Sequence, residues 1–127
     1  MNQPTWNGWR AGIANTRSQT ASAAKLDAAA IPRLKLKWAF GFPGTTAVYG
    51  QARMVAGRVF LGFDSGRVYS LDAVSGCMIW SFKADAGVRS AVTIGTDAAP
   101  AIAYFGDQAG TVYRRYGYGG ATLENQG

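Results

Sequence analysis

Apolar residues gather in three short runs in the middle of the chain, between residues 57 and 82. The runs are rich in aromatic and β-branched side chains and predict β-strands. Two groups of polar turn residues, 64–66 and 72–76, separate the runs, and each group ends in a glycine that tolerates a positive φ. The pattern therefore predicts a three-stranded antiparallel meander, with strands at residues 59–62, 67–71 and 78–82.

The same pattern occurs twice. Residues 59–62 (Val-Phe-Leu-Gly) are echoed by residues 103–106 (Ala-Tyr-Phe-Gly), and Gly76 is echoed by Gly120, an offset of 44 residues. Upstream, Trp38-Ala-Phe40 is echoed by Trp80-Ser-Phe82, an offset of 42 residues. A period of about forty residues with about four strands per repeat is typical of a β-propeller blade.

The repeat predicts an all-β chain and an incomplete β-propeller. We expect about two four-stranded antiparallel blades at residues 34–127 and an extended N-terminal segment at residues 1–33. Closed propellers usually contain about 4–8 blades, so 127 residues are expected to be part of a longer protein or of an assembly.

The N-terminal segment carries one helical signal. Asp27 is a suitable N-cap for a short helical turn at residues 28–31, which Pro32 ends. Leu34, Leu36 and Trp38 then alternate with basic residues, which predicts the outer strand of a blade with its apolar face inward.

The remaining strands are predicted from β-branched and aromatic runs. They are a weaker strand within residues 47–55, an inner strand at 88–94, and strands at 101–105 and 111–113. After Tyr113 the repeat ends, because Glu124 stands where the pattern calls for tryptophan. We expect an incomplete second blade, as a shift of the reading frame would produce.

The net charge is +6 and the calculated isoelectric point is about 9.8, values that invite a search for a nucleic-acid surface. The basic residues are spread along the chain, and Arg33, Lys35 and Lys37 alternate along one predicted strand. We interpret these three as a solvated strand face and predict no nucleic-acid partner. No apolar run of 18 residues occurs, so no membrane span is predicted, and the first residues lack the pattern of a signal peptide.

The chain contains no histidine and a single cysteine, Cys77. Within these residues this composition excludes a Ser-His-Asp triad, a His-ligated zinc site, a c-type haem motif and an internal disulfide. Cys77 is interpreted as a packed residue. The aspartates at positions 64, 85, 97 and 107 lie singly in turns, which predicts no calcium loop. No catalytic or metal-ligating residue is assigned.

Residues 71–80, which read Leu-Asp-Ala-Val-Ser-Gly-Cys-Met-Ile-Trp, resemble the tryptophan-docking motif of pyrroloquinoline quinone (PQQ) propellers. In that family the tryptophan of each blade packs between neighbouring sheets beside a glycine. The motifs at 6–9, 14–17 and 34–44 are similar to the entry of quinoprotein alcohol dehydrogenases. Residues 87–91 (Gly-Val-Arg-Ser-Ala) resemble the branch that oxidises polyvinyl alcohol, and the resemblance covers residues 6–113.

The resemblance implies a PQQ cofactor at the propeller centre, with Ca²⁺ acting as a Lewis acid. It also implies a catalytic carboxylate supplied by later blades, a cytochrome c as electron acceptor and a periplasmic location. The remaining propeller blades are the expected partners, and the chain by itself is expected to be inactive.

Three residues are candidates for cofactor binding. Arg89 follows the first complete blade, at the start of a predicted inner strand that faces the channel, and its guanidinium could donate to a cofactor carboxylate. Ser90 and Gln51 take comparable positions, with a hydroxyl and an amide for hydrogen bonding. The alternative for Arg89 is that it is a surface arginine beside a loop and has no role in cofactor binding. The alternative for the whole chain is a non-catalytic propeller that acts as a protein-binding scaffold, similar to outer-membrane assembly lipoproteins.

Overall fold

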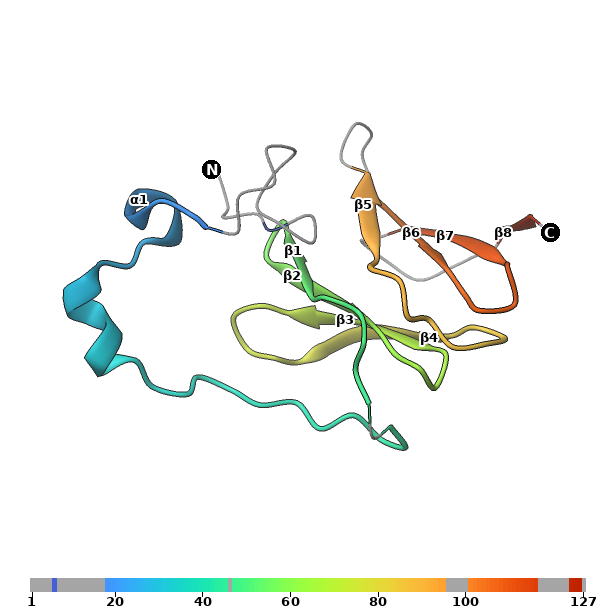
Figure 1. The fold of residues 1–127 in the computed structure, drawn as a ribbon, viewed down its shortest axis with the longest axis horizontal. Helices are drawn as coiled ribbons and strands as arrows, with labels where there is room; N and C mark the ends of the chain where they lie inside the picture. Colours follow the sequence, from blue (N-terminus) through green and yellow to red (C-terminus); the bar gives the residue numbers. More distant parts are fainter. Residues whose placement is uncertain (1–5, 7–17, 46, 96–100, 117–123, 127) are drawn as a thin grey trace.

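The computed structural model describes Trp6 and residues 18–45, 47–95, 101–116 and 124–126. These residues form two four-stranded antiparallel sheets, whose strands lie side by side in sequence order (Figure 1). The elements are α1 (Ala21–Ala24), η1 (Ala28–Arg33), β1 (Arg53–Val55), β2 (Arg58–Gly62), β3 (Arg67–Asp72), β4 (Met78–Lys83), β5 (Thr93–Gly95), β6 (Ile102–Gly106), β7 (Val112–Tyr116) and β8 (Glu124–Gln126). The prediction of a mostly β chain built from antiparallel sheets is confirmed, and the described strands do not close into a ring.

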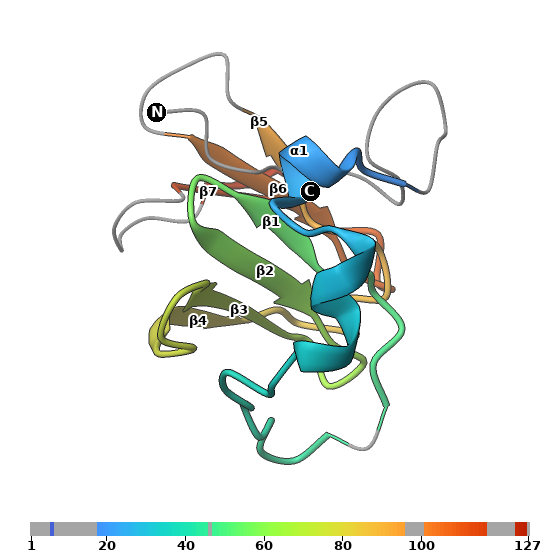
Figure 2. The same ribbon diagram turned by 90° about the vertical axis from the view of Figure 1, so that its left-hand side faces the viewer.

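Strands β1–β4 form the first sheet, and Figure 2 shows them side by side in that order. The turn between β2 and β3 closes through a bond from the Gly66 backbone N–H to the Phe63 carbonyl oxygen, at 2.9 Å. Gly66 has a φ of +80°, a conformation that a Cβ would strain. The predicted hairpin is therefore present, with glycine at the position that requires it.

The turn between β3 and β4 is organised by Asp72. Its Oδ1 accepts hydrogen bonds from the backbone N–H groups of Ser75 at 2.7 Å and Val74 at 3.0 Å. The hydrogen bonds from Ser75 lower the pKa of the Asp72 carboxyl the most, and the bond from Val74 lowers it further. Asp72 is thus the turn residue that the sequence predicts.

The face of the first sheet that carries Phe60, Val68, Trp80 and Phe82, called here the Trp80 face, packs against the second sheet, β5–β8. Phe82 lies 5.3 Å from Tyr113 between ring centroids. The buried apolar residues of this interface are Val55, Phe60, Val68, Ala84, Val88, Val92, Ile94, Ala103, Phe105 and Tyr113. The main core therefore lies between the two sheets.

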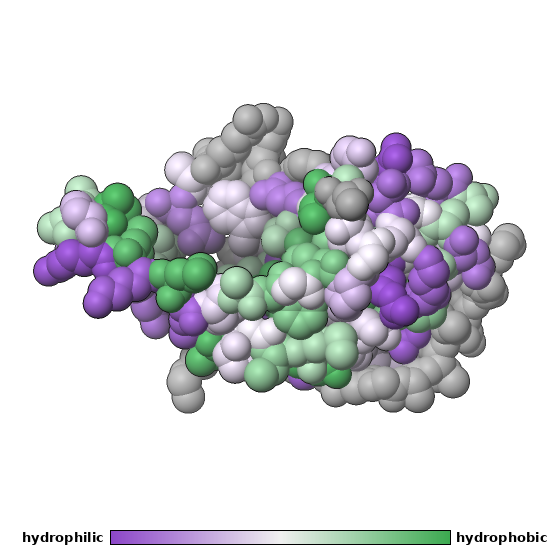
Figure 3. Space-filling model, turned by 90° about the horizontal axis from the view of Figure 1, so that it is seen from below, coloured by the Kyte–Doolittle hydropathy of each residue, from purple (hydrophilic) through white to green (hydrophobic). Residues whose placement is uncertain are grey.

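The opposite face of the first sheet, called here the Tyr69 face, carries Tyr69 and Leu71 and adjoins the buried Phe63. Residues 34–42, called here the 34–42 segment, cross it in extended form without belonging to a sheet. Its side chains Trp38, Phe40 and Phe42 pack on this face. Seen from below, apolar residues gather toward the middle of the molecule, and apolar and polar residues lie together at its left-hand end (Figure 3).

Two strand predictions are wrong in part. No strand forms over residues 34–38, and Leu34 and Leu36 are 61% and 85% exposed, because no described strand lies beside them to supply backbone partners. The inner strand predicted at 88–94 begins only at Thr93. Residue 88 is instead held by the first sheet, since its backbone N–H donates to the Phe63 carbonyl oxygen at 2.8 Å.

The helical turn predicted at 28–31 is present as η1, and the Asp27 carboxylate accepts from the backbone N–H of Ala30 at 2.8 Å. Pro32 lies inside the last turn of η1. The four-residue α1 was not predicted. Strand β7 continues to Tyr116, beyond the point where the repeat ends, and β8 has three residues where β4 has six. The entry motifs at 7–9 and 14–17, and Gly120, lie outside the described residues.

Candidate functional site

Four connections come together at one end of the two sheets: the segment before β1, the β2–β3 turn, the β4–β5 connection and the β6–β7 turn. Glycines allow this approach. A Cβ on Gly62 would lie 2.6 Å from Cγ1 of Val88, and one on Gly50 would lie 3.3 Å from the carbonyl oxygen of Ser90. The backbone N–H of Gln108 donates to the Gly87 carbonyl oxygen at 2.9 Å. The close contacts position the β4–β5 connection between the two sheets.

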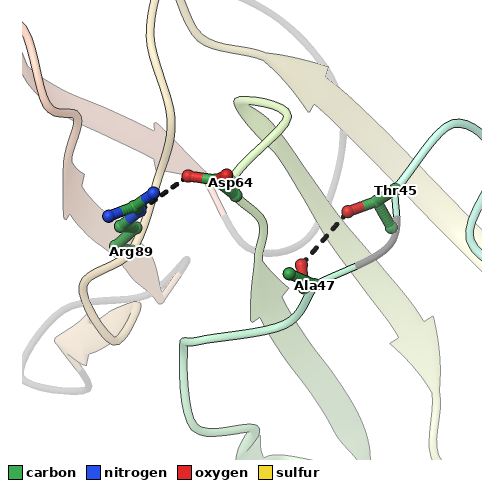
Figure 4. Close-up of polar contacts among 4 residues, drawn as sticks. All are labelled: Thr45, Ala47, Asp64 and Arg89. Atoms are coloured by element: carbon green, nitrogen blue, oxygen red, sulfur yellow. Dashed lines mark hydrogen bonds and ion pairs between the residues drawn. The ribbon is translucent and has the colours of Figure 1, made fainter.

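Arg89 lies on this connection. Its Nε donates to Oδ1 of Asp64, in the β2–β3 turn, at 2.6 Å (Figure 4). The side chains are 48% and 36% exposed, so water reaches both. The hydrogen bond lowers the pKa of the Asp64 carboxyl and raises that of the Arg89 guanidinium. Arg89 therefore stays charged and is tied to the first sheet.

The guanidinium of Arg89 also lies over the ring of Tyr49, with 4.7 Å between its central carbon and the ring centroid. This cation–π contact and the Asp64 bond hold the side chain from two directions. The Asp64 bond uses one of the five N–H donors that a guanidinium carries. The arrangement is chemically suited to bind a carboxylate or another planar anion.

Ser90 and Gln51 were predicted on inner strands. They lie instead in the connections that lead into these strands. Ser90 precedes β5, and its hydroxyl donates to the Gly106 carbonyl oxygen at 3.1 Å. Gln51 precedes β1 and is half-buried. The structure brings Arg89 together with Asp64 and Tyr49, which sequence reasoning did not assign to a site. The only signal in the sequence was the position of Asp64 in a predicted turn.

The end of the β4–β5 connection nearest β4 is anchored by Tyr113 and Asp107. The Tyr113 hydroxyl donates to Asp107 Oδ2 at 2.8 Å and accepts from the Asp85 backbone N–H at 3.1 Å. Asp107 Oδ2 also accepts from the Ala86 backbone N–H at 3.2 Å. Burial opposes the ionisation of Asp107, but the hydrogen bonds, led by that of Tyr113, outweigh it and lower its pKa. Arg89 thus lies three residues beyond a firmly bonded anchor.

A second arginine, Arg53, begins β1 and is 6% exposed. Its Nε has no hydrogen-bond partner among the described residues, and burial lowers the pKa of its guanidinium. A buried cationic donor without a carboxylate is costly unless an anion or water satisfies it.

In the part of the chain that the structure describes, no group of three or more His, Cys, Asp or Glu side chains is placed to hold a metal ion.

Cys77 is exposed, so its prediction as a packed residue is wrong. None of the described helices is long and apolar enough to cross a membrane.

No protein-family profile matches the chain. It is 48% identical over 89 residues to a polyvinylalcohol dehydrogenase of Pseudomonas sp., a match that covers 70% of this chain and 13% of that protein. It is 43% identical over 98 residues to a polyvinylalcohol dehydrogenase of Sphingopyxis sp. (strain 113P3), which covers 76% of this chain and 14% of that protein. The chain is therefore a partial homologue of these dehydrogenases and spans about one seventh of their length.

Proposed function

We propose that this chain is the N-terminal part of a PQQ-dependent alcohol dehydrogenase and supplies the first blades of its propeller. The observation that carries the proposal is the 48% and 43% identity to two polyvinylalcohol dehydrogenases. The whole protein would oxidise secondary alcohols of the polyvinyl alcohol type and pass electrons to a cytochrome c in the periplasm. Two antiparallel four-stranded sheets with a tryptophan-docking motif support the propeller assignment.

The donor groups present fit an anionic cofactor. PQQ is a planar quinone that carries carboxylates, and Arg89 offers charge-assisted N–H donors to such a group. Arg53 adds a second guanidinium, whose buried Nε has no hydrogen-bond partner among the described residues. The ligands of Ca²⁺ would come from elsewhere in the longer protein. When bound, PQQ supplies the two-electron acceptor and Ca²⁺ the Lewis acid.

The role of this chain would be to bind and orient. Arg89 would donate to a cofactor carboxylate, while Asp64 and Tyr49 hold the guanidinium in place. Asp64 also competes for the same guanidinium, because it is itself a carboxylate. Ser90 would add a hydroxyl oxygen and Gln51 an amide, at the same end of the sheets.

A domain exchange tests the proposal. The matched segment of the Sphingopyxis enzyme is replaced by the corresponding residues of this chain, and polyvinyl alcohol oxidation is assayed with PQQ and Ca²⁺. We expect activity to be retained. In this chimera Arg89→Gln should weaken PQQ binding about tenfold or more, since hydrogen bonds to charged groups contribute about 1.5–3 kcal/mol. Asp64→Asn keeps an oxygen that can accept the Arg89 Nε hydrogen bond but removes the competing negative charge, so it should strengthen binding.

Arg114→Gln is the matched control. Arg114 is an exposed arginine on β7 that lies over the ring of Tyr116, 5.5 Å from its centroid. Its loss removes the same charge and should leave PQQ affinity unchanged. A folded chimera that neither binds PQQ nor oxidises the polymer would contradict the proposal and favour the scaffold alternative.

A further inference from the structure

A turn from each sheet meets the chain at Gly87, two residues before Arg89. A Cβ on Gly87 would lie 2.6 Å from Oε1 of Gln108 and 3.1 Å from Oδ1 of Asp64. Gln108 lies in the β6–β7 turn of the second sheet, and Asp64 lies in the β2–β3 turn of the first. The Gln108 amide and the Asp64 carboxylate therefore approach the same side of Gly87.

Asp64 and Gln108 take the same place in the repeat. Each lies two residues before the glycine that closes its turn, and the two positions are separated by the offset of 44 residues. These glycines, Gly66 and Gly110, both have a positive φ, +80° and +88°. The residue types differ, because an ionised carboxylate only accepts hydrogen bonds, whereas an amide both donates and accepts them. The same turn position of two successive repeats thus brings an acceptor and a donor to one point.

The backbone around Gln108 is fixed, while its side chain is exposed. The Gln108 backbone N–H donates to the Gly87 carbonyl oxygen at 2.9 Å. Asp107, the preceding residue, accepts hydrogen bonds at both carboxylate oxygens, from the Tyr113 hydroxyl and from backbone N–H groups. Asp107 is therefore satisfied without the Gln108 amide, which remains available to Asp64.

Asp64 needs a second donor whenever Arg89 turns to another anion. Its Oδ1 accepts from Arg89 Nε at 2.6 Å (Figure 4), and the loss of this bond would leave a charged carboxylate that water reaches only in part. The last torsion of a glutamine side chain is broad and roughly two-fold, so a half-turn of the Gln108 amide places Nε2 where Oε1 lies. Nε2 would then donate to the Asp64 carboxylate in place of Arg89.

We propose that Gln108 is a positioning residue for Arg89, whose amide donates to Asp64 when the Arg89 guanidinium binds a cofactor carboxylate. The cofactor in this inference rests on the proposed function, but the exchange of donors at Asp64 can be measured without a cofactor. The exchange lowers the cost of releasing Arg89 from the carboxylate that competes for it. It also requires glycine at position 87, because a side chain there would separate Gln108 from Asp64.

The exchange of donors is tested in the 127-residue chain through the pKa of Asp64, followed by the NMR signal of its carboxyl carbon. Arg89→Met removes the first donor and should raise this pKa. Arg89→Met combined with Gln108→Met should raise it further, because the amide can no longer replace the guanidinium. Gln19→Met, which removes an amide from the N-terminal segment, is the matched control and should add nothing to Arg89→Met. Equal pKa values in Arg89→Met and in its combination with Gln108→Met would overturn the proposal.

The consequence for the cofactor is tested in the chimera with the Sphingopyxis enzyme. Gln108→Met should weaken PQQ binding about threefold or more, because Asp64 then competes for Arg89 without an alternative donor. The loss should disappear in the Asp64→Asn background, where no charged carboxylate needs a second donor. A loss that persists there would overturn the proposal, by making Gln108 a direct contact of the cofactor. PQQ binding that is insensitive to Arg89→Gln would instead contradict the proposed function, while the pKa of Asp64 in the 127-residue chain still decides the exchange.

Discussion

The two faces of the first sheet are covered in different ways. The Trp80 face packs against a complete second sheet, and Tyr113 ties the two sheets together through Asp107 and the Asp85 backbone. The Tyr69 face is covered by three side chains of one extended segment, which is attached to the described part of the first sheet by ring contacts and by the indole hydrogen bond of Trp38. Equivalent residues of the repeat lie at both interfaces, so the difference comes from what surrounds them.

The comparison separates two properties that a period-two pattern is usually taken to predict together. Alternation sets the direction of the side chains, and Trp38 and Phe40 point to the sheet as Trp80 and Phe82 do. Strand formation also needs a neighbouring backbone, which β3 supplies to β4 and no described element supplies to residues 34–42.

Truncation of the equivalent phenylalanines should give the largest effect. Phe82→Ala should lower the free energy of unfolding by about 3 kcal/mol, at the low end for a phenylalanine because the side chain is half-buried. Phe40→Ala should lower it by about 1 kcal/mol, because a segment without backbone bonds relaxes into the vacated space. Urea unfolding monitored by tryptophan fluorescence measures both. Equal losses would show that the two faces are equally well packed.

Much of this difference could be predicted from the sequence, but not all of it. The repeat placed the hairpin of β2 and β3, and Asp72 and Gly76 identified the second turn correctly. The partner of residues 34–38 could not be predicted, because the pattern of one strand contains no information about whether a neighbour is present. The same holds for Arg89, whose loop position depends on the bond between Val88 and Phe63, far apart in sequence.

The site was predicted less completely than the fold. Arg89 was singled out from its place after the first blade, whereas Asp64 was read only as a turn residue and Tyr49 was not considered. Their contact with Arg89 spans 25 residues in one case and 40 in the other, and no local pattern records such a contact. Tertiary geometry, rather than residue type, makes them a group.

Removal of the Tyr113 hydroxyl should have an intermediate effect. Tyr113→Phe deletes the donor to Asp107 and the acceptor of the Asp85 N–H in a buried position, so we expect a loss of about 1–2 kcal/mol in unfolding free energy. Tyr69→Phe is the matched control on the other face. The Tyr69 hydroxyl makes no hydrogen bond to a described residue, and its loss should change stability by less than about 0.5 kcal/mol. A similar loss for both variants would contradict a special role of Tyr113 between the sheets.

The smallest effect is expected from pH, and it again separates the two interfaces. The pKa of Asp107 is lower in the folded chain than in the unfolded one, so its contribution to stability is complete above about pH 4 and is lost as the pH falls through the folded value. Asp107→Asn should therefore reduce the acid dependence of unfolding between about pH 5 and pH 2. Tyr113→Phe should reduce it in part, because Tyr113 provides the leading bond that lowers this pKa. The Phe40 ring contacts Tyr69, which does not titrate between about pH 5 and pH 2, so Phe40→Ala should leave the slope unchanged. Equal slopes in all three variants would mean that acid acts on the chain elsewhere.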